Sequence, residues 1–423
     1  MNTTLQKLIP ALALVLLVSG CAKDSGTTKR GDSDKIQLVL TIPGGMRERP
    51  LYERVAEQFM ADYPNVEVEV RPVTGSGKYY QKVQVMIAGG EPPDLMWMGQ
   101  SFSEFADRGA FLDITERISS DIDTAKFLPA SLTWYQMNER QYGIPFGIDV
   151  QFLVYNKALF DAAGVAYPSA DWDYDEFLQK AKQLTLDTDD DGTIDQYGFR
   201  GHLEKSLFGA EFISPDGRTA RCDTPEMIAY VQTNLDLAHK HGIMPSLEES
   251  RQEALDEYTY FIQGKAAIQI MYTWNLPWLA DKFADLDWDI ALNPRVAQRG
   301  QWASSQGVVI AADTPHPDEA WALCRRFFGN DFQKAMAFRG VPTNYDAAKE
   351  VLAEHEGKPA NLGALHEARE ILYPTPRVLH LQELETQWRN NVESAWVQRA
   401  TPEEAMKEAQ RQLTRTINKH YPK

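Results

Sequence analysis

Cysteine is scarce in this chain, with only Cys21, Cys222 and Cys324 among 423 residues. These three residues form no Cys/His metal-binding spacing. Cys222 and Cys324 lie far apart in sequence, and Cys324 stands in an apolar helical pattern. An oxidising compartment would permit a disulfide between them, but we expect two unpaired structural cysteines.

Basic residues are also in the minority. The chain has 43 Lys and Arg against 60 Asp and Glu, a formal net charge of -17. This balance argues against nonspecific nucleic-acid binding and against adsorption to anionic lipid through a basic face. We interpret the charge mainly as a solubility feature. The sequence has no G-x-S-x-G, no H-E-x-x-H and no P-loop, so none of these catalytic motifs supports an enzyme.

The one marked apolar run, Leu8 to Val18, is too short to span a bilayer comfortably. Lys7 precedes it and LVSGC closes it, a pattern typical of a signal peptide over residues 1–20. LVSGC resembles the bacterial lipobox, in which the cysteine is acylated after cleavage. We therefore expect lipidation of Cys21, followed by a flexible linker over residues 21–35.

The remaining chain is long enough for two or three domains, and its 43% hydrophobic content is ordinary for a globular protein. Strands are predicted at 35–42, 66–73, 94–98, 149–156, 266–271 and 305–312. Helices are predicted at 50–63, 79–88, 172–184, 224–241 and 252–263. The tail from 379 to 419 is predicted to be mostly helical, with a capping box at Thr401. This alternation predicts α/β layers with a mainly parallel sheet.

Several segments together resemble the family 1 extracellular solute-binding proteins, the maltose-binding-protein-like receptors of ABC importers. They include EQFMADYPNVEVEV, KVQVMIAGGEPPDLMW, YGIPFGIDVQFLVYNKALFDAAGV, FIQGKAAIQIMYTW and TPEEAMKEAQ, in the family's order. The resemblance implies a two-lobed periplasmic-binding-protein-like α/β fold with interleaved lobes and a hinge. We assign lobe 1 to 36–145 and 306–341, and lobe 2 to 146–305 and 342–423.

The resemblance also implies a binding protein and not an enzyme, with a sugar or polyol as ligand and the permease subunits of an importer as partner. We expect a monomer and no organic cofactor. A secreted carbohydrate-active hydrolase and a ligand-sensing receptor without transport remain alternatives. Several tryptophans and few convergent Lys or Arg favour a neutral sugar over an anion.

Candidate ligand-binding residues follow the predicted strands, where open α/β sheets bind ligands. Trp274 is the strongest of them. The alternatives are core packing for the tryptophans and a surface role for the polar residues. Arg377 is a weaker candidate whose expected role is a surface salt bridge. The full predicted set is Arg47, Glu48, Trp97, Gln100, Ser101, Asp149, Trp274, Trp302, Ser305, Gln306 and Gly307.

An acidic loop gives the sharpest local motif. Residues 187–195 (DTDDDGTID) fit the first nine positions of an EF-hand calcium loop, but position twelve is Gly198 where a bidentate Glu is expected. The alternative is an acidic turn stabilised by side-chain hydrogen bonds. We favour a structural calcium ion, with the predicted ligands Asp187, Asp189, Asp191, Thr193 and Asp195.

Overall fold

The computed structural model describes residues 35–44, 47–74, 78–253, 255–374, 376 and 378–421. The predicted signal peptide, Cys21, nearly all of the predicted linker and Arg377 lie outside these residues. The chain divides into two units at Lys35 and Ile36, and the fold described below is that of the second unit.

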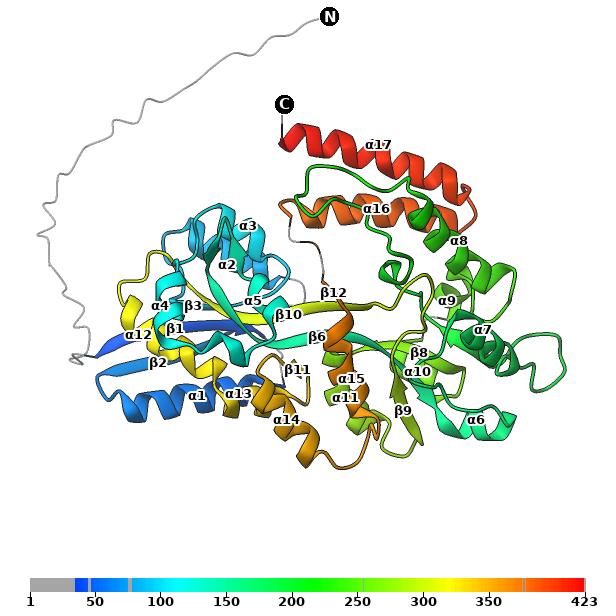
Figure 1. The fold of residues 1–423 in the computed structure, drawn as a ribbon, viewed down its shortest axis with the longest axis horizontal. Coiled ribbons are helices and arrows are strands. Elements are labelled where there is room, and N and C mark those ends of the chain that lie inside the picture. The colour runs from blue at the N-terminus through cyan, green and yellow to red at the C-terminus, as the bar shows by residue number, and fades with distance from the viewer. Residues whose placement is uncertain are drawn as a thin grey trace, which may run out of the picture. The chain divides into compact units, whose positions relative to one another are not determined.

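A single mixed sheet organises this unit, with strand order β2-β1-β3-β10-β6-β8-β7 (Figure 1). β9 and β11 pair with β6, and β12 pairs with β10. The strands are β1 (Ile36–Pro43), β2 (Val66–Val73), β3 (Leu95–Met98), β6 (Gly143–Asn156), β7 (Tyr197–Arg200), β8 (Ala266–Tyr272), β9 (Trp288–Ala291), β10 (Gln301–Ile310), β11 (Val341–Pro342) and β12 (Leu372–Pro374). A small hairpin joins β4 (Gln136–Met137) to β5 (Arg140–Gln141).

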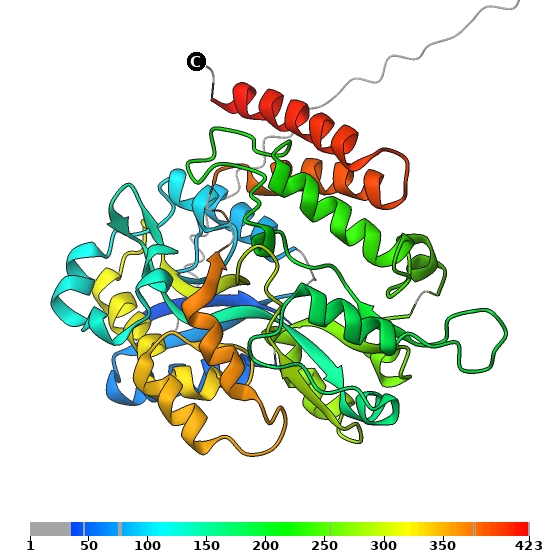
Figure 2. The same cartoon turned by 45° about the vertical axis from the view of Figure 1, so that its right-hand side comes forward.

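Helices flank this sheet on both sides (Figures 1 and 2). They are α1 (Arg49–Asp62), α2 (Tyr79–Ala88), α3 (Phe102–Asp107), α4 (Thr115–Asp121), α5 (Pro129–Thr133), α6 (Lys157–Ala163), α7 (Tyr174–Gln183), α8 (Pro225–His239), α9 (Leu247–Glu253), α10 (Glu257–Ile262), α11 (Leu276–Lys282), α12 (Pro317–Cys324), α13 (Asn330–Met336), α14 (Tyr345–Glu354), α15 (Leu362–Glu367), α16 (Leu381–Trp396) and α17 (Pro402–His420). Among the described residues, no helix is both long and apolar enough to cross a membrane.

The prediction of a mainly parallel sheet is wrong. β1 pairs in parallel with β2 and β3, and β7 pairs in parallel with β8, but β10 is antiparallel to both β3 and β6. β6 has 14 residues, all buried, and it extends from one half of the sheet into the other. The chain crosses along β6 and returns along β10, so these two strands must run in opposite directions.

Several element boundaries differ from those predicted, and β6 begins at Gly143 where the predicted strand begins at 149. Two other differences have local causes. The helix expected over 252–263 is divided into α9 and α10, because Asp256 caps a new helix by accepting from Tyr258 N and Thr259 N. β10 begins at Gln301, four residues before the predicted start, because its first residues pair with β12 and β6. The predicted capping box at Thr401 is confirmed, with Thr401 and Glu404 bonding each other's backbone.

The hydrophobic core shows how the two lobes interleave. One cluster combines residues of 38–146 with residues of 308–336, and another combines residues of 153–291 with residues of 378–417. A third cluster contains residues of β6 and β10. It combines residues from the sequence ranges of the first cluster with residues from those of the second. Cys222 and Cys324 are buried in different clusters and unpaired, as expected. The residue boundaries assigned to the lobes remain a prediction.

Candidate ligand-binding site

A cavity of about 660 Å³ lies between α16 and the ends of β7 and β8. Arg200 ends β7, Tyr272 ends β8, and Gln100 follows β3, so the cavity lies beyond the carboxyl ends of these strands, as in other open α/β sheets. It is lined by Gln100, Gln151, Arg200, Gly201, His202, Glu204, Lys205, Tyr230, Leu247, Glu257, Gln269, Ile270, Tyr272, Trp274, Trp302, Glu385, Trp388, Arg389, Val392, Glu393 and Trp396.

Three aromatic rings form one wall of this cavity. The rings of Tyr272 and Trp274 are stacked, with centroids 4.3 Å apart and an interplanar angle of 6°. Trp302 meets both edge-on, at 5.3 Å and 5.8 Å. A short 3-10 turn after β8 holds Trp274 in place, because Tyr272 N donates to Asn275 Oδ1 at 2.8 Å. The arrangement offers apolar faces for packing against a ligand ring.

Helix α16 forms the opposite wall and contributes two more tryptophans. Trp388 and Trp396 are eight residues apart, which puts them on the same helical face. Trp396 stacks on His202 at 3.9 Å, and burial lowers the pKa of His202 to about 4, so this imidazole is neutral at pH 7. The indole nitrogens of Trp388 and Trp396 are buried and have no hydrogen-bond partner within the described part of the chain.

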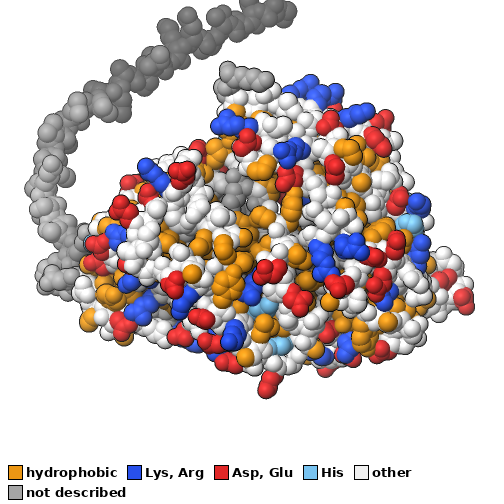
Figure 3. Space-filling model, viewed as in Figure 1, with side chains coloured by type: hydrophobic (Ala, Val, Ile, Leu, Met, Phe, Trp, Pro, Cys, Tyr) orange, Lys and Arg blue, Asp and Glu red, His pale blue; other side chains and the backbone are white. Residues whose placement is uncertain are grey.

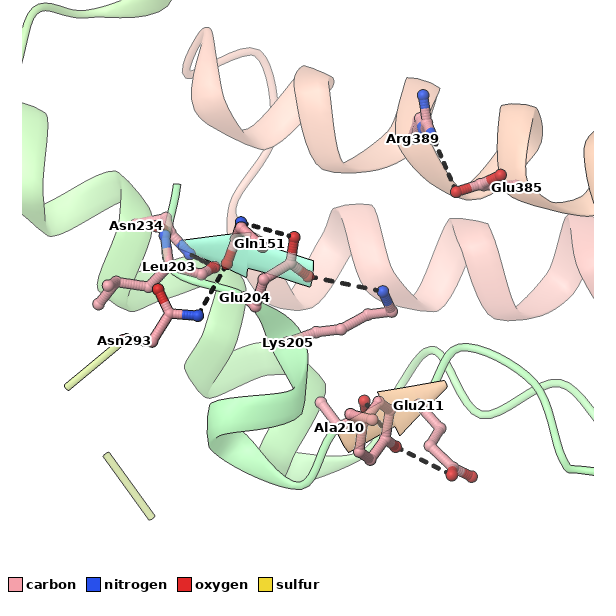
Figure 4. A network of polar contacts seen from close by, with 11 residues as sticks. Gln151, Leu203, Glu204, Lys205, Ala210, Glu211, Asn234, Asn293, Glu385 and Arg389 are labelled. Carbon is pink, nitrogen blue, oxygen red and sulfur yellow. Dashed lines mark hydrogen bonds and ion pairs between the residues drawn. The ribbon is translucent and has the colours of Figure 1, made fainter. Parts of the chain in front are cut away.

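The cavity lining also includes Glu204, which belongs to a network of polar contacts (Figure 4). Gln151 Nε2 donates to Glu204 Oε1 at 3.1 Å, and Asn293 Nδ2 donates to Gln151 Oε1 at 2.7 Å. Lys205 Nζ lies 3.9 Å from Glu204 Oε2. Burial raises the pKa of Glu204, and the charges of Lys205 and Arg389 oppose the rise. The network therefore holds a largely buried carboxylate in a fixed position at the cavity.

Arg200 and Gln269 add a donor and an acceptor on neighbouring strands, where they are direct partners in the β7–β8 register. The guanidinium of Arg200 lies over the ring of Tyr260 at 3.9 Å. Arg200 Nη1 and Gln269 Oε1 are both buried and lack hydrogen-bond partners among the described residues. A donor beside an acceptor suits a hydroxyl group, which can do both.

The charges around the cavity nearly cancel. Its lining contains four glutamates (Glu204, Glu257, Glu385 and Glu393) and three cations (Arg200, Lys205 and Arg389). Arg389 is paired with Glu385 along α16 at 2.7 Å. With one more negative charge than positive, the cavity favours a neutral, hydroxyl-rich ligand over an anion.

The sequence-predicted residues do not all reach this cavity. Gln100, Trp274 and Trp302 line it. Ser101 lines a neighbouring groove of about 300 Å³ between α3 and α16, and Ser305 lies in a small recess that also touches Gln100. Trp97 packs edge-on against Tyr79 at 5.8 Å.

Glu48 and Asp149 meet in a buried ionic cluster on Arg339. Glu48 forms an ion pair with Arg339, whose Nη1 lies 3.5 Å from Asp149 Oδ1. Asp149 Oδ1 also accepts from Gln306 Nε2 at 2.6 Å and from Thr273 Oγ1 at 3.4 Å. Burial raises the pKa of Asp149 against the opposing charge of Arg339. The cluster connects the loop after β1 with the crossing strands and the segment after α13.

Arg47 and Gly307 have structural contacts of their own. Arg47 forms an ion pair with Asp281, donates to Pro277 O at 2.6 Å and lies over the Trp278 ring. Its side chain borders a second groove, of about 850 Å³, with Phe338 and Trp288. A Cβ at Gly307 would lie 2.5 Å from Ile144 O, so strand packing alone requires glycine there.

The acidic loop has the compact form of a calcium loop. The carboxylates of Asp187, Asp189 and Asp195 offer oxygens within 4.8 Å of one another. Asp187 accepts from the backbone N of Asp191 and Gly192, and Gly192 has a φ of 89°. The oxygens could serve a hard cation, and the backbone bonds also fit the alternative of a self-stabilised turn.

Several cavity residues were missed by sequence reasoning. Tyr272 stands two residues before Trp274, and Trp388 and Trp396 share a helical spacing, so both signals were present. Arg200 and Glu204 could not be recognised as cavity residues from the sequence, because single charged residues near a short strand are usually solvated. Arg339, which joins Glu48 to Asp149, could not be recognised from the sequence either.

Comparison with known proteins supports the resemblance. One curated relative is a binding protein of Brucella abortus, which is 22% identical over 374 residues; the match covers 85% of this chain and 88% of that protein. Another is the arabinooligosaccharide-binding protein of Bacillus subtilis, which is 24% identical over 315 residues; the match covers 71% of this chain and 69% of that protein. Among solved structures, an ABC substrate-binding protein from Listeria monocytogenes in complex with cycloalternan has a TM-score of 0.77 and 20% identity, covering 91% of this chain and 99% of that chain. A Streptomyces glaucescens receptor studied unliganded and with acarbose has a TM-score of 0.75 and 19% identity, covering 92% and 99%.

These neighbours share the two-lobed periplasmic-binding-protein-like fold. The family model for bacterial extracellular solute-binding proteins matches residues 45–333, about two thirds of the sequence. The chain therefore belongs to the bacterial extracellular solute-binding protein family.

Proposed function

We propose that this protein binds a neutral carbohydrate in the cavity between α16 and β8 and delivers it to an ABC importer. The observation that carries the proposal is the stacked pair of Tyr272 and Trp274, with Trp302 edge-on to both, in a cavity of about 660 Å³. The apolar faces of sugar rings pack well on such indole and phenol faces, and the volume lies within the usual range for small-molecule sites.

The polar groups of the cavity support the same ligand class. Glu204 is an acceptor, while the donors are Arg200 Nη1 and the indole N–H groups of Trp388 and Trp396, which have no partners among the described residues. Buried polar groups without partners cost free energy, which a ligand rich in hydroxyls would recover. Relatives named for arabinooligosaccharide binding, and structural neighbours bound to cycloalternan or acarbose, agree with a carbohydrate.

A panel of mono- and oligosaccharides tests this proposal, with each neutral sugar compared with its uronic acid. We expect at least one neutral saccharide to raise the melting temperature and to bind with one-to-one stoichiometry in calorimetry. Incubation should leave the sugar uncleaved. A panel in which only anions bind, or in which the bound saccharide is hydrolysed, would contradict the proposal.

The family places the protein outside the cytoplasm. We further propose that acylated Cys21 anchors it to a bacterial membrane through the linker over residues 21–35, and that it acts as a monomer with the permease subunits of the importer. The lipobox-like LVSGC sequence supports the anchor. Acidic and basic side chains are interspersed on the face in Figure 3, so this face carries no large region of one charge for binding anionic lipid.

A structural calcium ion in the loop over 187–195 is also part of this proposal. The grouping of Asp187, Asp189 and Asp195 supports it, together with the αL glycine at position six of the loop. Without the bidentate Glu at position twelve, we expect weaker binding than in a complete EF-hand loop.

A further inference from the structure

The C-terminal helix pair carries a second cluster of metal-ligand side chains, far from the acidic loop in sequence. α16 and α17 pack side by side in Figures 1 and 2, and the end of α17 meets the start of α16. His380 precedes α16, Glu383 is in its first turn, and His420 ends α17. Each of the three offers a ligand atom within 4.8 Å of the others.

Two of these atoms lie close to the spacing that a small metal ion requires. His420 Nε2 lies 3.0 Å from Glu383 Oε2. With zinc–ligand distances near 2.1 Å, two ligand atoms of a tetrahedral zinc lie about 3.4 Å apart. A few tenths of an ångström of movement would therefore admit the ion between the imidazole and the carboxylate.

The third ligand stands at a position that can adjust. His380 occupies the N-cap position of α16 with a φ of 60°, and its side chain makes no capping hydrogen bond to the helix. Its ring is stacked on that of His420, with centroids 3.6 Å apart and an interplanar angle of 14°. Two imidazolium cations at this spacing would repel each other, so the stack requires at least one neutral ring, and a neutral ring has a free lone pair. Side-chain rotation of His380 would turn its lone pair toward the shared point.

We propose that His380, Glu383 and His420 bind a divalent transition-metal ion, with Zn²⁺ the best match. Two imidazoles and one carboxylate form a ligand set that zinc takes in proteins, and three protein ligands leave a fourth position for water. Glu104 of α3 and Arg108, which follows α3, also act electrostatically on His380, so one charge nearby favours the cation and one opposes it.

Such an ion would have a structural consequence for the ligand cavity. It would tie the start of α16 to the end of α17, and α16 carries Trp388 and Arg389 on the cavity wall. The binding of metal to the folded state alone would stabilise this wall by mass action. The inference concerns a separate site and holds whether or not the cavity binds a sugar.

Calorimetry with ZnCl₂ on the full chain, purified without a histidine tag and stripped with a chelator, tests the site. We expect one zinc ion per chain at this site, and at least tenfold weaker binding in Glu383→Gln and in His420→Ala. His241→Ala, outside the cluster, should bind zinc as the parent does. Melting temperatures in chelator show whether each variant is folded, and Glu383→Gln keeps the proposal testable if His420→Ala unfolds.

Co²⁺ provides a second measurement, because direct coordination by imidazole nitrogen changes its visible absorption. We expect intense d–d bands in the parent and their loss in Glu383→Gln and His420→Ala. The proposal is wrong if the parent gives only the spectrum of the hydrated ion, or if both variants bind zinc as tightly as the parent. Either result would identify the cluster as an ordinary His–Glu ion pair.

Discussion

The indole of Trp274 lies parallel to the phenol ring of Tyr272, with centroids 4.3 Å apart and an interplanar angle of 6°. This pair forms a flat apolar surface at the end of β8 and at the edge of the candidate cavity. Because Trp274 follows the last strand residue and sits in a 3-10 turn, its ring can be removed without interrupting the sheet.

We predict that Trp274→Ala weakens binding of the identified sugar by roughly ten- to a hundredfold, equivalent to about 1–3 kcal/mol of lost apolar contact. Calorimetry measures the effect. Trp278→Ala is the matched control, because Trp278 is a 41% exposed tryptophan outside the cavity. Unchanged affinity in Trp274→Ala would move the binding site away from this wall.

Periodic and contiguous patterns allowed much of the fold to be predicted. VEVEVRPV alternates, and the structure has β2 with the predicted bounds; α2 also has its predicted bounds. Strand direction could not be predicted in this way, because a buried strand such as β6 has the same apolar composition in either orientation. β6 and β10 are antiparallel because the chain crosses the sheet along β6 and returns along β10, and no local sequence pattern records this path.

The candidate site was only partly predictable, for a related reason. Trp274 and Trp302 follow or begin a strand, so their position near the cavity could be inferred from local sequence. Arg339 lies after α13, and its importance arises from Glu48 and Asp149, which are 291 and 190 residues away in sequence. Contacts between such distant residues leave no local pattern to detect.

We expect the Glu204→Gln substitution to raise the stability of the protein and to lower its affinity for sugar. Burial raises the pKa of this carboxyl in the folded state, so the folded protein binds the proton more tightly than the unfolded chain does. The charged form therefore costs stability above the folded pKa, and this cost disappears as pH falls below the unfolded value. We predict that Glu204→Gln raises the melting temperature at pH 7 but not at pH 4.

Sugar affinity should fall in the same variant, because the amide replaces one acceptor oxygen with a donor and removes the charge. Melting curves at the two pH values and calorimetry at pH 7 measure both effects. Glu403→Gln, on α17 and away from the cavity, is the control and should change neither. A loss of stability in Glu204→Gln at pH 7 would show that the bonds of the carboxylate outweigh its burial.

Cys21→Ser tests the proposed membrane anchor. A serine hydroxyl cannot form the thioether by which a lipid is attached to the cysteine, so we predict that the variant is released from membranes or is poorly processed. Membrane fractionation and intact mass measure the outcome, with Cys222→Ser as the cysteine control. Equal membrane retention with unchanged mass would refute lipidation at Cys21.

The acidic loop predicts a calcium-dependent melting temperature. Calcium that binds only the folded state at about a hundredfold above its Kd contributes about 2.7 kcal/mol, so a chelator should lower the melting temperature of the parent. Asp189→Ala should abolish this sensitivity. Asp216→Ala, which removes an exposed turn aspartate elsewhere, should retain it. If the parent melts identically with and without chelator, the loop is a turn stabilised by its own hydrogen bonds.

Arg339 is predicted to hold the crossing region together electrostatically. Its side chain is 15% exposed, and those of its partners Glu48 and Asp149 are 5% and 9% exposed, so removing the guanidinium leaves two carboxylates buried without a cation. Breaking a buried ion pair from one side costs about 3–5 kcal/mol. We therefore predict that Arg339→Met destabilises the protein by this amount at pH 7.

The destabilisation should shrink as pH falls, because burial raises the pKa of Asp149 and protonation of this carboxyl removes uncompensated charge. Arg326→Met is the matched control, because the ion pair of Arg326 with Asp62 is exposed and contributes about 0–1 kcal/mol. Denaturant unfolding at pH 7 and pH 4 measures both variants. If Arg339→Met is no more harmful than Arg326→Met at pH 7, the buried cluster contributes no net attraction to the stability of the protein.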